Sequence, residues 1–271
     1  MPLPTFWLIS FLIAFAATTA GSICGIGGGI IIKPVLDATG LIGVSEASVL
    51  SGLTVLVMSV VTIIRRCGRR FKGLDLGRTL PLSLGAVAGG YLGKWLFQLV
   101  RVGMGDTAAG MLQAALLLAL TILSLAYTLA QKSIRTRNVK NRLACVCAGL
   151  VLGAVSSLLG IGGGPINLIL LSFLFSMDLR EAGLNSIFII ALSQFTSLLA
   201  ITAQDFAAID PALLFAMTSG GVAGGFLGSS ICRRLSNQKI NALFVGMMLL
   251  ISIICVYNIL RFSGLEVRLH F

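Results

Sequence analysis

From Thr107 to Gln131 the chain runs for 25 residues without a charged side chain. An α-helix needs roughly 20 apolar residues to cross the hydrocarbon core of a bilayer, so this run alone is long enough to span one. Seven other runs have a similar apolar character: Trp7–Gly21, Ala47–Ile64, Gly77–Gly93, Leu143–Leu159, Leu184–Ala203, Pro211–Ile231 and Ile240–Leu260. None alternates in the manner of barrel strands, and backbone groups in lipid must be paired within the segment. The sequence therefore predicts an all-α polytopic membrane protein.

The composition supports this prediction, because 57% of the residues are hydrophobic and only 11% are charged. The net charge of +11 does not indicate nucleic-acid binding, since the basic residues lie between apolar runs and form no stripe on a polar domain. Two basic clusters stand out: Arg65, Arg66, Arg69, Arg70 and Lys72, and Lys132, Arg135, Arg137, Lys140 and Arg142. Short basic loops stay on the cytoplasmic side, and they can touch anionic lipid. We expect a multi-pass protein of the cell (inner) membrane.

The first apolar run has no basic residue before it, because Lys33 is the first charged side chain; we interpret the run as a retained helix and not a signal peptide. The six cysteines fall mostly in or beside apolar runs and suggest no disulfide framework. The single histidine, His270, lies outside the runs, which argues against a zinc site and against serine-protease chemistry. We predict no metal, no cofactor and no enzymatic activity.

The sequence repeats itself at an offset of 135 residues. The motif Gly25-Ile26-Gly27-Gly28-Gly29 recurs as Gly160-Ile161-Gly162-Gly163-Gly164, and the stretch Val87–Gly93 recurs as Val222–Gly228 with one conservative change. Tandem duplication is a common architecture of secondary transporters. We predict one integral membrane unit made of a first transmembrane repeat, residues 1–135, and a second, residues 136–271.

Charge indicates how the two repeats are oriented. The cluster Arg65–Lys72 maps onto Ala200–Ala207, which has no basic residue, whereas Arg233 and Arg234 map onto uncharged positions in the first repeat. Equivalent loops of opposite charge character are expected on opposite sides of the membrane, which predicts inverted repeats. If each segment that begins at a glycine motif crosses the membrane, there are ten crossings; if it is re-entrant, there are eight. We favour ten, within a predicted range of roughly 8–10 segments that includes a broken segment at each motif.

The two glycine motifs are the candidate substrate site. Consecutive glycines destabilise a continuous helix, and irregular backbone at membrane depth is tolerated only inside the protein or beside a watery cavity. A helix that starts after such a break aims free N–H groups and its positive dipole end at that cavity, which suits an anion. Tight helix packing is the alternative for these motifs, and it is our preferred interpretation of the second repeated motif, at 85–90 and 220–225.

These residues resemble a known family. The stretch GIGGG-I-I-I-K with Pro34, the stretch GIGGG with Pro165, and the segments that follow Glu46 and Glu181 are similar to the TauE/SafE family of sulfite exporters and toluene sulfonate uptake permeases. The resemblance covers both halves. It implies a secondary carrier of small anions that contain sulfur, such as sulfite, sulfonates, sulfoacetate or related organic anions.

Polar residues near the motifs complete the candidate site. Lys33 either offsets the charge of the anion or pairs with Asp37, four residues on. The uncharged candidates either donate hydrogen bonds to the anion or bond between helices. Glu46 and Glu181 either carry coupling protons or serve a first helical turn. The full set of predicted substrate-binding residues is Gly25, Gly27, Gly28, Gly29, Lys33, Ser51, Gly160, Gly162, Gly163, Gly164, Asn167, Asn185, Ser186 and Gln194.

The function predicted from the sequence is a permease that alternates access around a midplane site formed by the two motifs. The expected partners are the small anion, the lipid bilayer and a coupling ion, either a proton or sodium, but no nucleic acid. The alternatives are a passive anion channel and a non-transporting membrane assembly subunit.

Overall fold

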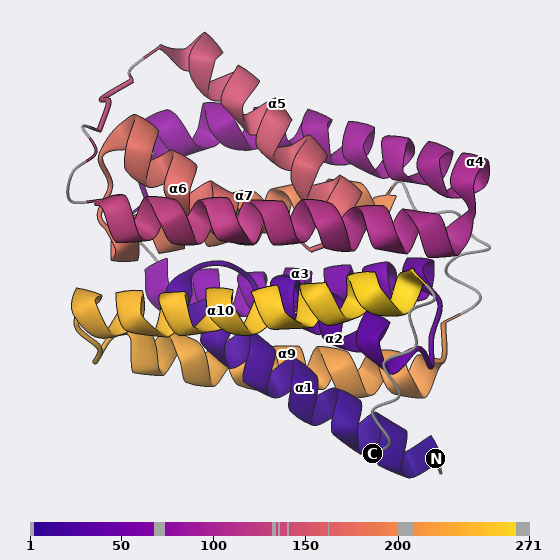
Figure 1. Ribbon diagram of the computed structural model, residues 1–271. Coiled ribbons are helices and arrows are strands. Elements are labelled where there is room, and N and C mark those ends of the chain that lie inside the picture. Colours follow the sequence, from indigo (N-terminus) through magenta and orange to yellow (C-terminus); the bar gives the residue numbers. More distant parts are fainter. Residues whose placement is uncertain are drawn as a thin grey trace.

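The computed structural model describes residues 3–67, 74–131, 134, 136–139, 141–161, 163–199 and 209–263. All the regular secondary structure in these residues is helical (Figure 1). The helices are α1 (Leu3–Cys24), α2 (Gly29–Thr39), α3 (Val44–Cys67), α4 (Leu76–Ala130), α5 (Arg142–Leu159), α6 (Gly164–Phe175), α7 (Leu179–Leu199), α9 (Pro211–Cys232) and α10 (Asn237–Phe262).

Within this described part, seven helices are long and apolar enough to cross a membrane. The longest, α4, has 55 residues and contains Gly105, whose φ of 82° and ψ of 167° interrupt the helix. Each piece of α4 on either side of Gly105 exceeds the roughly 20 residues that a crossing needs. By contrast, α2 has 11 residues and α6 has 12, so neither crosses alone. The prediction of an all-α polytopic membrane protein is confirmed.

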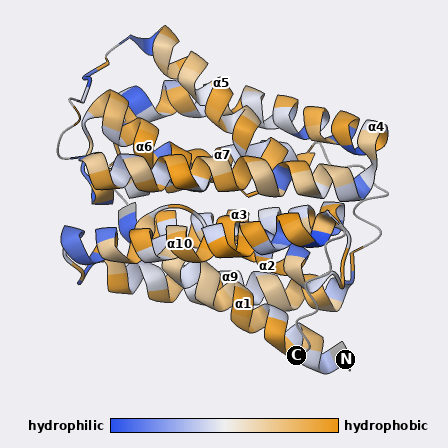
Figure 2. Cartoon of the chain, viewed as in Figure 1, coloured by the Kyte–Doolittle hydropathy of each residue, from blue (hydrophilic) through white to orange (hydrophobic). Residues whose placement is uncertain are grey.

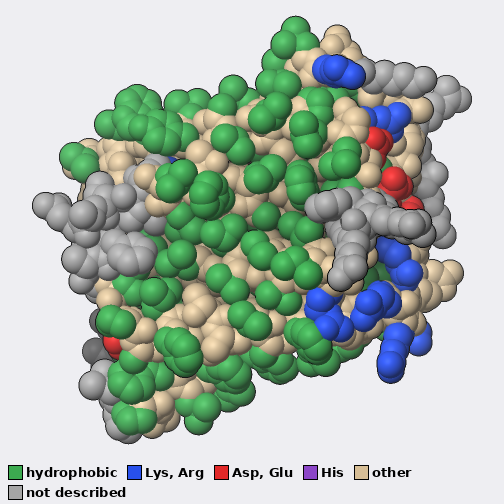
Figure 3. Space-filling model, turned by 180° about the vertical axis from the view of Figure 1, so that it is seen from behind, with side chains coloured by type: hydrophobic (Ala, Val, Ile, Leu, Met, Phe, Trp, Pro, Cys, Tyr) green, Lys and Arg blue, Asp and Glu red, His purple; other side chains and the backbone are tan. Residues whose placement is uncertain are grey.

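The surface of the bundle matches this assignment. Large hydrophobic side chains such as Phe215, Leu199 and Ile253 are exposed along the sides of the helices, and apolar residues extend along most of their length in Figure 2. Lys and Arg gather at one end of the face in Figure 3. The apolar band with a charged border is the pattern expected of a protein surrounded by lipid.

One end of the bundle, called the basic end below, joins six helix termini. Arg66 at the end of α3 donates to the carbonyl of Arg180 at the start of α7, at 3.1 Å. Arg78, at the start of α4, donates to the carbonyl of Phe175 at the end of α6, at 3.3 Å. Arg65 donates to Ser230, near the end of α9, at 2.9 Å. The basic residues Arg69, Arg70, Lys72, Lys132, Arg135 and Lys140 lie outside the described residues.

The opposite end joins the remaining termini. Trp7, near the start of α1, donates to the Asp210 carboxylate that caps α9, at 2.8 Å. Arg261, in the last turn of α10, donates to the main-chain carbonyl of Asp37 near the end of α2. The chain therefore enters along α1 and returns along α2 at this same end. Asn138, just before α5, bonds Arg78 at the basic end, where α6 also ends. Both short helices are thus re-entrant, and our preference for ten crossings was wrong because each returns to the end from which its preceding helix started.

Glycines allow two pairs of helices to pack closely. A Cβ added to Gly85, Gly89 or Gly93 of α4 would lie 2.0–2.1 Å from a carbonyl oxygen of α5. A Cβ added to Gly220 or Gly228 of α9 would lie 2.7 or 2.4 Å from a carbonyl oxygen of α1. Such close backbone approach is the packing that small residues permit in membranes. The packing interpretation of the second repeated motif is therefore confirmed.

These two helix pairs correspond to each other at the offset of 135 residues. Gly85 contacts the carbonyl of Val146, and the equivalent Gly220 contacts the carbonyl of Phe11, which is equivalent to Val146. Each half thus supplies the partner helix of the other half, so that α1 packs on α9 and α5 packs on α4. The orientation of the two repeats across a membrane stays a prediction.

Candidate functional site

Both glycine motifs break the helical path of the chain. In the first motif, Gly25 and Gly27 have φ values of 81° and 68°. In the second, Gly160 and Gly163 have φ values of 66° and 101°. These values lie in the left-handed region, where a side chain is disfavoured and glycine is not. The breaks separate α1 from α2 and α5 from α6, as the sequence predicted. Gly162 lies outside the described residues.

The two breaks meet each other. A Cβ added to Gly29 would lie 2.5 Å from the carbonyl oxygen of Ile161. In the equivalent contact, a Cβ added to Gly164 would lie 3.2 Å from the carbonyl oxygen of Ile26. Each motif therefore approaches the backbone of the other, and the first residue of each short helix is the point of contact.

The meeting point lies near mid-depth in the bundle. A Cβ on Gly27 would touch Val55, near the middle of α3, at 3.3 Å, and Ile190, near the middle of α7, at 3.4 Å. Neither short helix has a side-chain cap: Gly28 and Gly163 are the N-cap residues. The first four N–H groups of a helix lack partners within the helix, and the dipole makes this end positive. Two such ends near one point provide donors for an anion.

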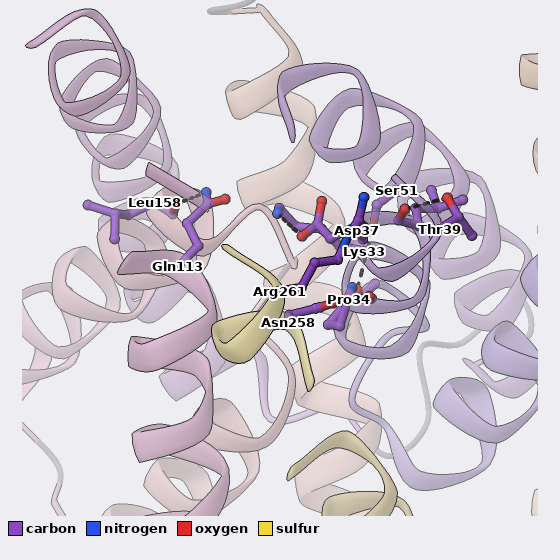
Figure 4. Close-up of polar contacts among 11 residues, drawn as sticks. Lys33, Pro34, Asp37, Thr39, Ser51, Gln113, Leu158, Asn258 and Arg261 are labelled. Carbon is purple, nitrogen blue, oxygen red and sulfur yellow. Dashed lines mark hydrogen bonds and ion pairs between the residues drawn. The ribbon is translucent and has the colours of Figure 1, made fainter. Parts of the chain in front are cut away.

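Lys33 belongs to the first repeat but reaches the second motif. Its side chain is only 2% exposed, and its Nζ lies 2.6 Å from the carboxylate oxygen Oδ2 of Asp37 (Figure 4). Its Cε would lie 3.1 Å from a Cβ added to Gly160. The interpretation in which Lys33 pairs with Asp37 is therefore confirmed. The same side chain passes close to the turn of the second motif, so pairing and an anion-binding role are compatible.

Three of the predicted polar residues lie beside the motifs. Ser51 donates to the carbonyl of Gly29 at 3.5 Å. Its equivalent, Ser186, is fully buried, and its hydroxyl has no hydrogen-bond partner among the described residues. Asn167 is 1% exposed; its Nδ2 would lie 2.7 Å from a Cβ added to Gly163, and its Oδ1 is unpartnered within the same described set. Buried polar groups without partners cost stability, so these are candidates for ligand contacts.

Two other predicted residues serve helix packing. The amide oxygen of Asn185 accepts from Thr79 at 2.5 Å and from the N–H of Asp75 at 3.2 Å, which joins α7 to the start of α4. Gln194 is buried on α7, with its Oε1 3.5 Å from the position of a Cβ on Gly52 in α3. Glu46 and Glu181 lie in the first turns of α3 and α7, as one of the two interpretations expected.

Sequence reasoning missed two polar residues from other helices. Gln113 of α4 and Asn258 of α10 are 4% and 1% exposed, and they line a small cavity together with Lys33 and Asp37. The cavity has a volume of about 10 Å³, room for about one water molecule. The available signal was that Gln113 is a rare polar residue inside the longest uncharged run.

A multi-pass helical bundle with two re-entrant helices that start at mid-depth defines a membrane protein of the transporter class. Residues 10–254 match the family model described as "Sulfite exporter TauE/SafE", so the chain belongs to the TauE/SafE family of membrane transporters. It is similar to the "Probable membrane transporter protein YunE" of Bacillus subtilis (strain 168), with 24% identity over 270 residues that cover 93% of this chain and 98% of that protein. No solved structure matches. Membership of a transporter family is consistent with a protein that is not an enzyme.

Proposed function

We propose that this transporter moves small oxyanions, with sulfur-containing anions such as sulfite and organic sulfonates as the first candidates. The observation that carries the proposal is the reciprocal contact of the two glycine motifs, in which Gly29 meets Ile161 and Gly164 meets Ile26. It brings the N-termini of α2 and α6 to one place near mid-depth, where both can donate N–H groups to a single anion. The family description names sulfite, which fits a compact anion whose oxygens accept several hydrogen bonds.

Lys33 supplies the formal positive charge in this proposal. A buried ammonium beside the Gly160 turn attracts an anion, whereas free N–H groups provide only partial charges. Ser51 and Ser186 lie at equivalent places beside the two breaks, and Ser186 has a hydroxyl to donate. The resulting site has charge, backbone donors and hydroxyl donors, which is the chemistry that recognises a sulfite or sulfonate group.

Alternating access follows from the directions of the short helices. From the meeting point, α2 runs toward the opposite end and α6 runs toward the basic end. If the two repeats are inverted, rocking of one repeat against the other exposes the motifs first to one side and then to the other. A coupling ion would then set the direction of net transport.

The test is uptake of radiolabelled sulfite and sulfoacetate by proteoliposomes under defined ion gradients. The central variant is Lys33→Gln combined with Asp37→Asn, which removes the lysine without leaving an unpaired buried carboxylate. A charge-assisted hydrogen bond contributes about 1.5–3 kcal/mol, so the apparent affinity should fall roughly 10- to 100-fold. The matched control is Lys239→Gln, because Lys239 is an exposed lysine at the basic end.

Three results would contradict the proposal. Transport would be absent if no sulfite, sulfonate or related oxyanion moved under any gradient, as expected of an assembly subunit. Flux that does not saturate and ignores every ion gradient would indicate a passive channel. Equal affinities in the double variant and in Lys239→Gln would remove Lys33 from the anion site.

A further inference from the structure

Three buried oxygen atoms face one small cavity beside the anion site. They are Oδ1 of Asp37, Oε1 of Gln113 and Oδ1 of Asn258, and none has a hydrogen-bond partner within the part of the chain that the structure describes. Their side chains are 8%, 4% and 1% exposed. They come from α2, α4 and α10, so helices far apart in the sequence converge here.

The hydrogen bonds of the two amides fix which atoms face the cavity. The Nε2 of Gln113 donates to the carbonyl of Leu158 at 2.6 Å, and the Nδ2 of Asn258 donates to the carbonyl of Pro34 at 2.9 Å. In each amide the donor is therefore used and the oxygen is left over. Figure 4 shows Gln113 and Leu158 on one side, with Lys33, Asp37 and Asn258 on the other.

The leftover atoms are all acceptors, and this decides what the cavity can bind. One carboxylate oxygen and two amide oxygens suit a hard cation, whereas an anion would find no donor among them. The volume of about 10 Å³ admits one water molecule or one small ion. Buried oxygens from helices that surround a transport site are the kind of ligand that binds coupling ions.

A cation already lies next to these oxygens. The ammonium of Lys33 holds the other carboxylate oxygen of Asp37 at 2.6 Å, and Arg261 donates to the main-chain carbonyl of Asp37 from α10. While Lys33 neutralises Asp37, a second cation in the cavity would be repelled. The Cε of Lys33 also lies beside Gly160, so the ammonium has two possible partners within its reach: Asp37 and an anion at the glycine motifs.

We propose that Asp37, Gln113 and Asn258 form a sodium site that becomes available when Lys33 turns from Asp37 to the bound anion. This inference rests on the anion transport proposed above. The anion withdraws the ammonium, the carboxylate becomes free, and one Na⁺ replaces the lysine as its counterion. Because the coupling is reciprocal, sodium strengthens anion binding by the same factor by which the anion strengthens sodium binding.

The experiment measures sulfite binding to the purified full-length protein in detergent, by calorimetry, as Na⁺ replaces choline at constant pH and ionic strength. In the unaltered protein, Na⁺ should raise the apparent sulfite affinity at least tenfold. Asp37→Asn should still bind sulfite, but without dependence on Na⁺. Gln113→Leu should raise the half-maximal Na⁺ concentration at least tenfold, because it removes one of three ligands. The matched control is Gln98→Leu on the same helix, which should behave like the unaltered protein.

Several results would overturn the sodium site. Sulfite binding that is equally strong in choline and in Na⁺ would do so, as would a rise in affinity caused by protons and not by Na⁺. Equal sodium dependence in Gln113→Leu and Gln98→Leu would remove Gln113 from the site, even if Asp37→Asn failed to fold. If sulfite and all related oxyanions fail to bind under every condition, the proposed function fails instead, so the two failures are distinguishable.

Discussion

Replacement of Gly89 by alanine tests the close packing of α4 against α5. The added Cβ would lie 2.0 Å from the carbonyl oxygen of Leu150, whereas an ordinary contact begins near 3.4 Å. The two helices would therefore have to separate locally by roughly 1.4 Å, and overpacking of this kind costs about 1–3 kcal/mol. Alanine also favours the helix over glycine by about 1 kcal/mol, which offsets part of the loss.

The control removes that ambiguity. Gly246→Ala on α10 meets nothing within 4 Å, so it gains the same helix propensity without the clash. The difference between the two variants is the packing cost, about 1–3 kcal/mol. For a chain of this size, each kcal/mol shifts the melting temperature by about 2–4 °C, so Gly89→Ala should melt roughly 2–12 °C below Gly246→Ala.

Thermal unfolding in detergent, followed by the intrinsic fluorescence of Trp7 and Trp95, measures this difference. The two tryptophans lie on α1 and α4, so each closely packed helix pair carries a reporter. The equivalent substitution Gly224→Ala should also lower the midpoint, because its Cβ would lie 2.6 Å from the carbonyl oxygen of Phe15. If Gly89→Ala and Gly246→Ala melt together, α4 and α5 do not approach as closely as described.

Two further predictions address orientation and the basic end. In a variant whose native cysteines are replaced by serine, a membrane-impermeant maleimide added to intact cells should label Ser263→Cys but not Gln238→Cys, because short basic loops stay inside; the reverse pattern would contradict our assignment of the basic end to the cytoplasm. Arg65→Gln should lower the unfolding free energy by about 1–2 kcal/mol, because Arg65 lies 3.4 Å over the ring of Phe226 and donates to Ser230. An unchanged midpoint in thermal unfolding would show that the cation–π contact contributes nothing.

Much of the fold could be predicted from the sequence because lipid imposes strong local rules. A helix in lipid must pair its own backbone, so apolar runs such as Thr107–Gln131 predict helices without knowledge of their neighbours. The breaks at the two glycine motifs were predicted for the same reason, since Gly25 and Gly160 favour backbone that no long helix accepts. The number of crossings was harder, because length alone does not tell whether a short helix continues or returns.

The candidate site was only partly predictable, because it depends on contacts between distant segments. The pairing of Lys33 with Asp37 follows from a spacing of four residues on one helix. The placement of Gln113 and Asn258 around that pair depends on how α4 and α10 pack, and no local pattern encodes it. Asn185 shows the converse: its position after the second motif suggested a ligand contact, but its oxygen is used by Thr79 at the start of α4.

The exchange of partner helices between the halves has a consequence for biosynthesis. The face of α1 that receives the glycines of α9 is made first, but α9 leaves the ribosome roughly 190 residues later, on the order of 10–40 s at about 5–20 residues per second. During that interval α1 lies in the membrane without its permanent neighbour, whereas α5 meets α4 almost as soon as it is inserted. The nascent chain therefore completes one pair of helices early and the other only near the end of synthesis, and a membrane chaperone or insertase has its longest opportunity to hold α1.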